Sequence, residues 1–107
     1  MAQTEDVLLE RFATTGDAAA LSQIIRAHAG LVYGVCLRIL ADRDKAADAT
    51  QETFLHLLRK ARTIKGSIPG WLHSVATCRA TDIIRRDSAR RRTEARYADL
   101  QPRQATS

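Results

Sequence analysis

The sequence predicts an all-α protein, a compact bundle of about four helices. Alanine and leucine are abundant, while aromatic residues make up only 5% of the chain, a bias that favours helices over strands. Apolar residues recur at i, i+3 and i+4 along most of the 107 residues, and cap residues separate the periodic segments. A hydrophobic content of 45% with 27% charged residues is typical of a folded chain of one domain.

The first helix is expected over residues 4–15. Thr4 is a suitable N-cap because its hydroxyl oxygen can accept a hydrogen bond from the first turn. Glu5 and Asp6 follow, and their charges favour a helix N-terminus. Gly16 is the expected end, since glycine readily takes the left-handed conformation that closes a helix.

The second helix is expected over residues 17–41, with Asp17 as its N-cap. Apolar residues keep helical spacing through about seven turns, which indicates a helix that faces the core along much of its length. Gly30 and Gly34 lie inside it. Each lowers helix stability by about 1 kcal/mol relative to alanine. We therefore expect a neighbouring helix to pack closely against these two glycines.

The third helix is expected over residues 44–62, with the segment Asp42-Arg43-Asp44 as its cap, and has two faces. One face has the spacing of a core face and comprises Ala47, Thr50, Phe54, Leu57, Leu58 and Ala61. The other face is polar with one apolar member and comprises Asp48, Gln51, Glu52 and Leu55. A polar face is most often only solvated surface. An apolar side chain in line with carboxylates is also typical of a helix-docking site, so both interpretations stay open.

A short basic segment, residues 63–70, joins the third and fourth helices. Ile64 and Lys65 precede Gly66 and Ser67, whose backbone N–H groups can approach a phosphate or a base edge. Trp71 follows and has two possible roles. It can stack on a base, which contributes about 1–3 kcal/mol where it occurs, or it can be the main aromatic residue of the core.

The fourth helix is expected over residues 69–95, with Pro69 in its first turn. Its inward face comprises Leu72, Val75, Ala76, Ala80 and Ile83. The outer face carries short or adaptable side chains, which can meet unstacked bases without steric conflict. These are His73, Ser74, Thr77, Cys78 and Thr81.

The net charge of +5 is unevenly distributed along the chain. Residues 1–17 carry four acidic residues and one arginine, whereas residues 79–96 carry seven arginines against three acidic residues. Such a cluster can attract a polyanion and contact its phosphates without reading sequence, although a basic segment is also often only a solvated surface. The arginines expected to do so are Arg85, Arg86, Arg90, Arg91 and Arg92. We expect Asp82 to form an ion pair within or between helices.

No catalytic or metal site is predicted. His28, His56 and His73 stand apart, and the chain has no HExxH, phosphate-binding loop or nucleophile motif. Cys36 and Cys78 lack the spacing of a zinc site and are expected to be reduced and at least partly buried. We therefore expect a protein that is not an enzyme and needs no cofactor.

The composition favours a cytoplasmic monomer. The acidic N-terminus lacks the apolar segment of a signal peptide, and no apolar run is expected to reach the roughly 20 residues of a membrane span. A four-helix core would use most of the apolar residues. Residues 1–98 are expected to form the domain, and residues 99–107 a flexible tail or the start of a linker.

Several spaced motifs together resemble region 2 of the extracytoplasmic-function (group 4) sigma factors of the sigma-70 family. They are Asp44-x-x-x-Asp48-x-x-Gln51-Glu52-x-Phe54-Leu55, Gly66-Ser67, Trp71-Leu72-x-x-Val75-Ala76 and Asp82-x-x-Arg85-Arg86, preceded by Gly16-Asp17-x-x-Ala20. The resemblance covers roughly residues 6–95. It implies the all-α fold of that region and a role in transcription initiation without catalysis.

The resemblance also implies partners for particular residues. By similarity, Asp48, Gln51, Glu52 and Leu55 would bind the coiled coil of the β′ clamp in core RNA polymerase. The loop at residues 64–70 would hold a base flipped from the promoter −10 element, and the fourth helix would contact the melted non-template strand. An anti-sigma factor is a further implied partner. The implied DNA-binding residues are Ile64, Lys65, Gly66, Ser67, Trp71, His73, Ser74, Cys78, Arg85, Arg86, Arg90 and Arg91.

Three features depart from the family pattern. The loop between Gly66 and Trp71 is about two residues shorter than in well-known members. Cys78 stands where many members have asparagine, so the base preference there is expected to be relaxed or different. The sequence ends at Ser107 without the second domain that reads the −35 element, which suits either an excised region 2 or a natural single-domain relative. The alternative function is a helical domain that binds a regulator and does not recognise DNA.

Overall fold

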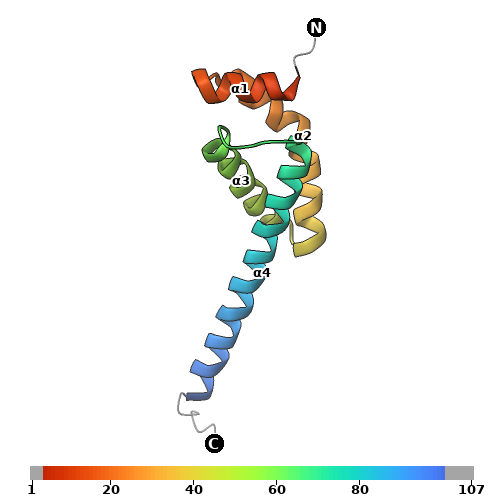
Figure 1. Ribbon diagram of the computed structural model, residues 1–107. Helices are drawn as coiled ribbons and strands as arrows, with labels where there is room; N and C mark the ends of the chain where they lie inside the picture. The colour runs from red at the N-terminus through yellow and green to blue at the C-terminus, as the bar shows by residue number, and fades with distance from the viewer. Residues whose placement is uncertain (1–3, 101–107) are drawn as a thin grey trace, which may run out of the picture.

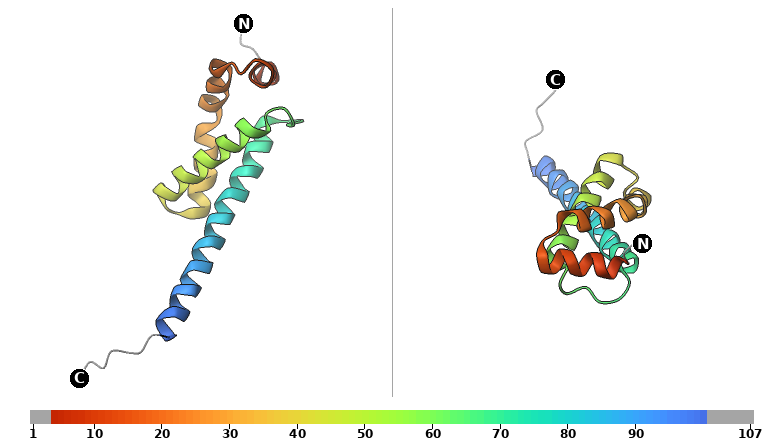
Figure 2. Two further views of the ribbon diagram at one scale, coloured as in Figure 1. Left: turned by 90° about the vertical axis from the view of Figure 1, so that its left-hand side faces the viewer. Right: turned by 90° about the horizontal axis from the view of Figure 1, so that it is seen from above.

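Four helices make up the protein in a computed structural model, which describes residues 4–100 (Figure 1). They are α1 (Glu5–Thr15), α2 (Ala18–Leu40), α3 (Arg43–Lys60) and α4 (Ile68–Leu100). The helices α2, α3 and α4 pack side by side, and α1 crosses one end of this bundle (Figure 2). The predicted all-α fold of about four helices is confirmed.

The helix ends follow the caps predicted from the sequence. The side chains of Thr4, Asp17 and Asp42 each accept a hydrogen bond from a backbone N–H in the first turn of the helix that follows. Gly16 closes α1 in the left-handed conformation, with φ 71°. The exception is the end of α4, which continues to Leu100 and so passes the expected end by about one turn. Most of the predicted tail, including Pro102, lies outside the described residues.

The core lies between α2, α3 and the first half of α4. Ile24 and Val32 of α2, Leu57 of α3 and Leu72 of α4 have no solvent-exposed surface. Each such side chain contributes about 1.5–3 kcal/mol when it is moved from water into an apolar interior. This core orients the outer faces of α3 and α4, which carry the candidate functional residues.

One prediction about α2 needs correction. With 23 residues and a mean hydropathy of 1.3, Ala18–Leu40 is long and apolar enough to cross a membrane by those two measures. Core helices meet the same criteria, and α2 buries Ile24, Val32, Val35 and Cys36 against its neighbours. Packing against the neighbouring helices thus buries 39% of the most apolar part of α2.

The expected close packing at Gly30 and Gly34 is wrong. A methyl group built on either glycine would meet no atom within 4 Å outside the local helix backbone. Gly30 is exposed to solvent and Gly34 is half-buried. Neither glycine is needed for a close approach of another helix.

The core face of α3 is rotated around the helix axis by about 65° from the predicted one. Ala47 and Leu58 were expected in the core but are exposed, and Leu58 retains 48% of its accessible surface. Thr53, which was not expected there, is fully buried because its hydroxyl donates to the carbonyl oxygen of Ala49 at 2.7 Å. The complete buried set is Ala46, Ala49, Thr53, Phe54 and Leu57.

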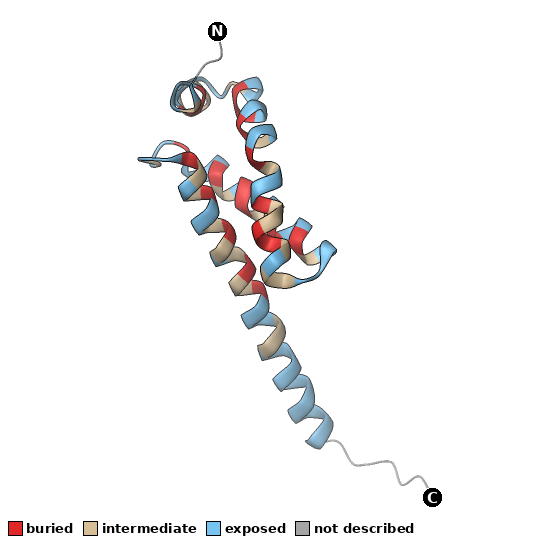
Figure 3. Ribbon diagram, turned by 90° about the vertical axis from the view of Figure 1, so that its right-hand side faces the viewer, coloured by how far each residue is buried: buried red, intermediate tan, exposed pale blue. Residues whose placement is uncertain are grey.

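The helix α4 leaves the bundle halfway along its length. Its buried residues end at Ile83, and every residue from 89 to 100 is exposed. Figure 3 shows the last turns of the helix as an uninterrupted exposed segment, after one turn of intermediate burial. The protein therefore presents a long helical segment with no other part of residues 4–100 packed around it.

Candidate functional site

The polar face of α3 points away from the core. At about 100° per residue, the centre of the set Asp48, Gln51, Glu52 and Leu55 lies about 170° around the helix from Leu57. Asp48 and Gln51 are exposed, and Leu55 keeps 48% of its surface exposed. We call these four residues the α3 stripe. They form a continuous surface with one apolar side chain among polar ones.

A groove of about 590 Å³ separates this stripe from α4. Glu52 and Leu55 line one side, while Arg79, Arg85 and Arg86 line the other. The Nε of Arg79 is buried and has no hydrogen-bond partner among residues 4–100. Cations therefore lie beside the carboxylates of the stripe, an arrangement that suits a partner surface carrying both signs of charge.

Trp71 and His56 stack across the α3–α4 contact. Their ring centroids are 5.6 Å apart and their planes differ by 10°. Burial lowers the pKa of His56 below its ordinary range, and the positive charges of Arg79, Lys60 and Arg59 lower it further. Trp71 is half-buried and packs against the core, so one of its two predicted roles, that of a core aromatic residue, is seen in the structure. Its ring face toward His56 is covered.

An ion pair fixes α4 to the start of α3 at the point where α4 leaves the bundle. The Lys45 ammonium donates to Asp87 at 2.6 Å, and this hydrogen bond lowers the pKa of Asp87 below its ordinary value. Asp87 also accepts from Arg90 at 3.4 Å. This pair orients the segment of α4 that carries most of the arginines.

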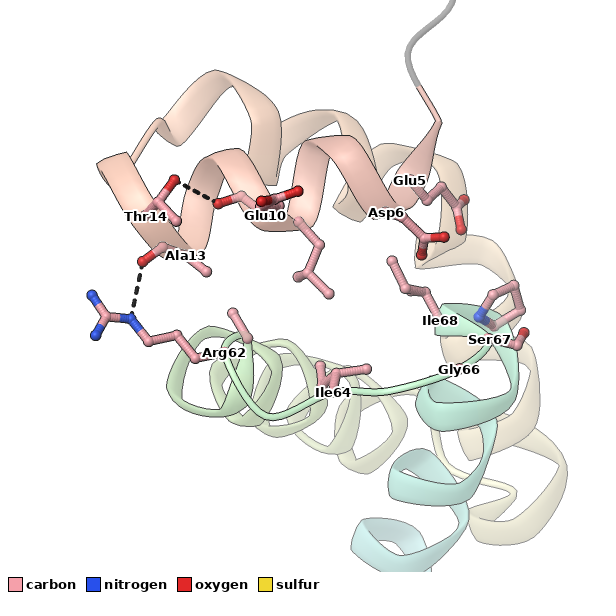
Figure 4. Close-up of a pocket in the computed structure, with 13 residues that line it drawn as sticks. Glu5, Asp6, Glu10, Ala13, Thr14, Arg62, Ile64, Gly66, Ser67 and Ile68 are labelled. Carbon is pink, nitrogen blue, oxygen red and sulfur yellow. Dashed lines mark hydrogen bonds between the residues drawn. The ribbon is translucent and has the colours of Figure 1, made fainter.

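The loop between α3 and α4 borders a second and larger groove of about 1080 Å³, shown in Figure 4. Three of the residues that were expected to bind DNA line it, namely Ile64, Gly66 and Ser67 of the loop, whereas Lys65 is exposed and is not part of the lining. Gly66 has φ 89°, a conformation that glycine adopts without strain. Leu9 and Ile68 give the groove an apolar floor.

The opposite wall of this groove belongs to α1, which the sequence did not indicate. Glu5, Asp6 and Glu10 line it. Two polar contacts hold α1 in place: Glu5 with His28 of α2, and the Arg62 Nε with the Ala13 carbonyl oxygen at 3.0 Å. The groove thus combines an apolar floor with three carboxylates and one guanidinium, that of Arg62. This set has a net negative charge and suits an uncharged ligand with N–H donors better than a phosphate.

The short side chains of α4 lie on two sides of the helix. Ser74 and Cys78 are exposed and lie within about 40° of each other around the helix, while His73 is exposed about 100° away from Ser74. Cys78 was expected to be partly buried and is exposed, because it lies across the helix from the buried Ala76 and Ala80. Cys36, in contrast, is fully buried, and burial raises the pKa of its thiol.

The arginines of α4 differ in their partners. Arg86 lies 3.8 Å from Glu52 of the α3 stripe, and Arg90 contacts Asp87 and Glu94. Within residues 4–100, Arg85 forms no ion pair. The predicted pairing of Asp82 is likewise absent from the described residues, and Asp82 instead lines the groove beside Arg79.

The chain is similar to proteins of one known family. A family model described as sigma-70 region 2 matches residues 24–91. An ECF RNA polymerase sigma factor SigE from Mycolicibacterium smegmatis is 38% identical over 79 residues, which cover 70% of this chain and 31% of the relative. A SigK from Mycobacterium tuberculosis is 36% identical over 95 residues, covering 86% of this chain and 50% of the relative. The chain thus spans half or less of the length of these relatives.

Proposed function

We propose a function from one established premise: this chain belongs to the sigma-70 region 2 family, as a region 2 domain of the extracytoplasmic-function type. The domain binds core RNA polymerase through the α3 stripe and promoter DNA through the loop and α4. It acts as a monomer in the cytoplasm and performs no catalysis. It stabilises the melted −10 element by binding unstacked bases of the non-template strand, which offsets the few kcal/mol needed to expose them.

The single observation that carries the docking proposal is the position of the α3 stripe. Its four side chains are held on a rigid helix, directly opposite the core, with Leu55 half-exposed among them. Helix-docking hot spots have this form, with an apolar anchor surrounded by polar groups. A helical partner such as the β′ clamp coiled coil can lie along the stripe and place a charged side chain in the adjoining groove near Arg79.

The groove at the loop is the site that we propose for an extruded base. Its floor at Leu9 and Ile68 can contact the flat face of a base, and the backbone at Gly66 and Ser67 can reach a base edge. The carboxylates of α1 would disfavour a phosphate inside the groove. The strand would therefore run past the groove along the face of Ser74 and Cys78, with only the base inserted.

The experiment that tests the proposal is capture of the isolated β′ clamp helices by the wild-type domain and by two variants. Asp48→Lys with Glu52→Lys reverses two charges on the stripe. Glu10→Lys with Asp99→Lys makes the same change in net charge at exposed positions away from α3. We expect the stripe variant to bind at least about 30-fold more weakly, because a hot-spot residue typically contributes about 2 kcal/mol, and the control variant to bind like wild type.

Circular dichroism of each variant establishes that the fold is intact. Equal binding by the wild type and the stripe variant would remove the docking assignment. Failure of the folded wild type to bind at all would favour the alternative function, a helical domain that binds a regulator such as an anti-sigma factor. The grooves beside α1 and α4 would then be the surfaces to test against that regulator.

A further inference from the structure

We propose that the groove between α3 and α4 binds a small phosphate monoester whose other end carries N–H donors, as a nucleoside monophosphate does. The groove has a volume of about 590 Å³, within the range of about 300–1,000 Å³ that is typical of small-molecule sites. Four arginines and two carboxylates line it, so its positive potential favours an anion over a cation. The existence of this site does not depend on the proposed function.

Two rows of side chains from antiparallel helices form the walls of the groove. The α3 row is spaced i, i+3, i+4 and i+7, and the α4 row i, i+3 and i+7, so each row lies on one side of its helix. Lys45 at the start of α3 reaches Asp87, whereas His56 near its end stacks on Trp71 near the start of α4, so the helices are antiparallel. The rows comprise Glu52, Leu55, His56 and Arg59 on α3, and Arg79, Asp82 and Arg86 on α4.

The end of the groove nearest the loop is cationic. Burial lowers the pKa of His56, and the nearby positive charges of Arg79, Lys60 and Arg59 lower it further. These cations therefore surround the imidazole, which is neutral at pH 7 and still has one N–H group to donate. Neither Arg59 nor Arg79 forms an ion pair within residues 4–100. Both guanidinium groups thus retain their charge for a ligand.

The guanidinium group of Arg79 lacks one hydrogen bond. Its Nε is buried and has no acceptor among residues 4–100, and a buried donor without a partner is unfavourable. A ligand oxygen that draws the guanidinium group toward the groove would supply this acceptor. Arg59, Arg79 and His56 together offer three donor groups. A phosphate monoester matches them, because it has three acceptor oxygens and nearly two negative charges.

The opposite end of the groove offers acceptors. Glu52 and Asp82 line it, and Asp82 forms no ion pair within the part of the chain that the structure describes. The contact of Glu52 with Arg86 is long, at 3.8 Å, so the Glu52 carboxylate can accept further hydrogen bonds. Carboxylates accept from N–H groups such as those of a guanine base. A ligand with its phosphate at the cationic end and a base at the acidic end would therefore satisfy both ends.

Binding of GMP to the whole chain tests the inference. Inorganic phosphate and guanosine are probes that each lack one part of GMP, and a short DNA strand without terminal phosphates is the fourth probe. Each is titrated at constant ionic strength while NMR follows the imidazole resonances of His56 and the indole N–H of Trp71, the single tryptophan of the chain.

Two variants with equal loss of charge accompany the wild type. Arg59→Gln with Arg79→Gln removes the cationic end of the groove. Arg26→Gln with Arg38→Gln makes the same change in net charge at exposed positions of α2. Circular dichroism establishes that each variant is folded.

The wild type should bind GMP at least about 10-fold more tightly than inorganic phosphate or guanosine, because each of these can reach only one end. The Arg59/Arg79 variant should bind GMP at least about 10-fold more weakly, since two charge-assisted contacts are lost. The Arg26/Arg38 variant should stay within about twofold of wild type, because exposed charges far from the site are screened.

In the wild type, bound GMP should also raise the pKa of His56, since a nearby anion favours the protonated ring. This measurement tests the site without any variant. Equal weakening in the two variants would overturn the inference, because net charge alone would then determine binding. Binding of the DNA strand or of guanosine as tightly as GMP, or no binding of GMP by the folded wild type, would also overturn it.

A ligand in this groove would compete with the partner of the α3 stripe, and this consequence alone rests on the proposed function. Glu52 and Leu55 belong to both surfaces. GMP should therefore weaken capture of the isolated β′ clamp helices by the wild type, but not by the Arg59/Arg79 variant. Capture that GMP leaves unchanged would remove the competition, whereas absence of capture with GMP binding intact would remove the docking proposal alone.

Discussion

The two halves of α4 have the same secondary structure but different sources of stability. Residues 68–83 bury five side chains in the core, including Leu72 and Ile83. Residues 84–100 contact the rest of the protein mainly through ion pairs of Arg86 and Asp87 with α3. The first half is helical because its apolar side is packed, whereas the second half depends on helix propensity and on pairs such as Arg90–Glu94.

Under the proposed function, this difference would give the two halves of α4 different tasks. A packed segment holds its side chains in fixed positions, which suits the recognition of individual bases near Ser74 and Cys78. The side chains of an exposed segment can change position at a small cost in free energy. This freedom suits contacts with phosphates, which carry no sequence information. The contrast between the packed and the exposed half of α4 leads to three predictions about the stability of the fold, from the largest expected effect to the smallest.

Leu72→Ala should destabilise the protein by about 2–5 kcal/mol, because it removes a fully buried side chain and leaves a cavity. The matched variant is Ile84→Ala, one residue past the last buried position, where the side chain is 40% exposed. It should cost less than about 1 kcal/mol. Urea unfolding of both variants measures the difference, and equal costs would mean that the second half of α4 is packed against something in solution.

Asp87→Asn should weaken the link between α3 and α4 at neutral pH. The pKa of Asp87 is lowered in the folded protein, mainly by the hydrogen bond from Lys45, so the carboxylate stabilises the fold above its unfolded pKa, near 3.8. That contribution is lost as the pH falls through the lower, folded pKa. The stability difference between wild type and variant should therefore be present at pH 7 and disappear at strongly acidic pH.

Thermal unfolding at several pH values tests this pH dependence. Lys45→Met provides the control, since it removes the hydrogen-bond donor and should abolish most of the pH dependence assigned to Asp87. A difference that stays constant down to the lowest pH would contradict the assignment.

Ala89→Gly should lower the local stability of the helix in the exposed half by about 1 kcal/mol. The free energy of global unfolding should stay almost unchanged. Amide hydrogen exchange measures the local effect, which should be confined to residues 84–100. Ala80→Gly is the counterpart in the packed half, where the side chain is fully buried, and it should lower global stability by at least about 1 kcal/mol. A global effect of Ala89→Gly would show that the two halves unfold together.

The helix ends could be predicted from the sequence because single residues determine them. Three side chains accept a hydrogen bond from a backbone N–H of the next helix, namely those of Thr4, Asp17 and Asp42. Gly16 ends α1 in the left-handed conformation. Each of these interactions is local and can be recognised in a sequence. The polar stripe of α3 was also predictable, since carboxylates at helical spacing are distinctive. In both cases the decisive interaction involves residues only a few positions apart.

The rotation of the α3 core face could not be predicted, because alanines at 46, 47 and 49 fit several helical phases equally well. Thr53 completes the buried face only because its hydroxyl is satisfied by the backbone within the helix. The acidic wall of the large groove was equally inaccessible, since it depends on how α1 crosses the loop. The different surroundings of Arg86 and Arg92 could not be predicted either. They depend on the point at which α4 leaves the bundle, because Arg86 lies close enough to α3 to contact Glu52 and Arg92 does not.

The continuity of α4 has a mechanical consequence. From Ile83 to Leu100 the helix extends about 25 Å beyond the core, as a rod fixed at one end. A rotation of the bundle by about 10° would move the free end by about 4 Å, close to one phosphate step along a DNA strand. The angle at which α3 seats on its partner would thus determine, through the length of this lever, which phosphates Arg96 can reach.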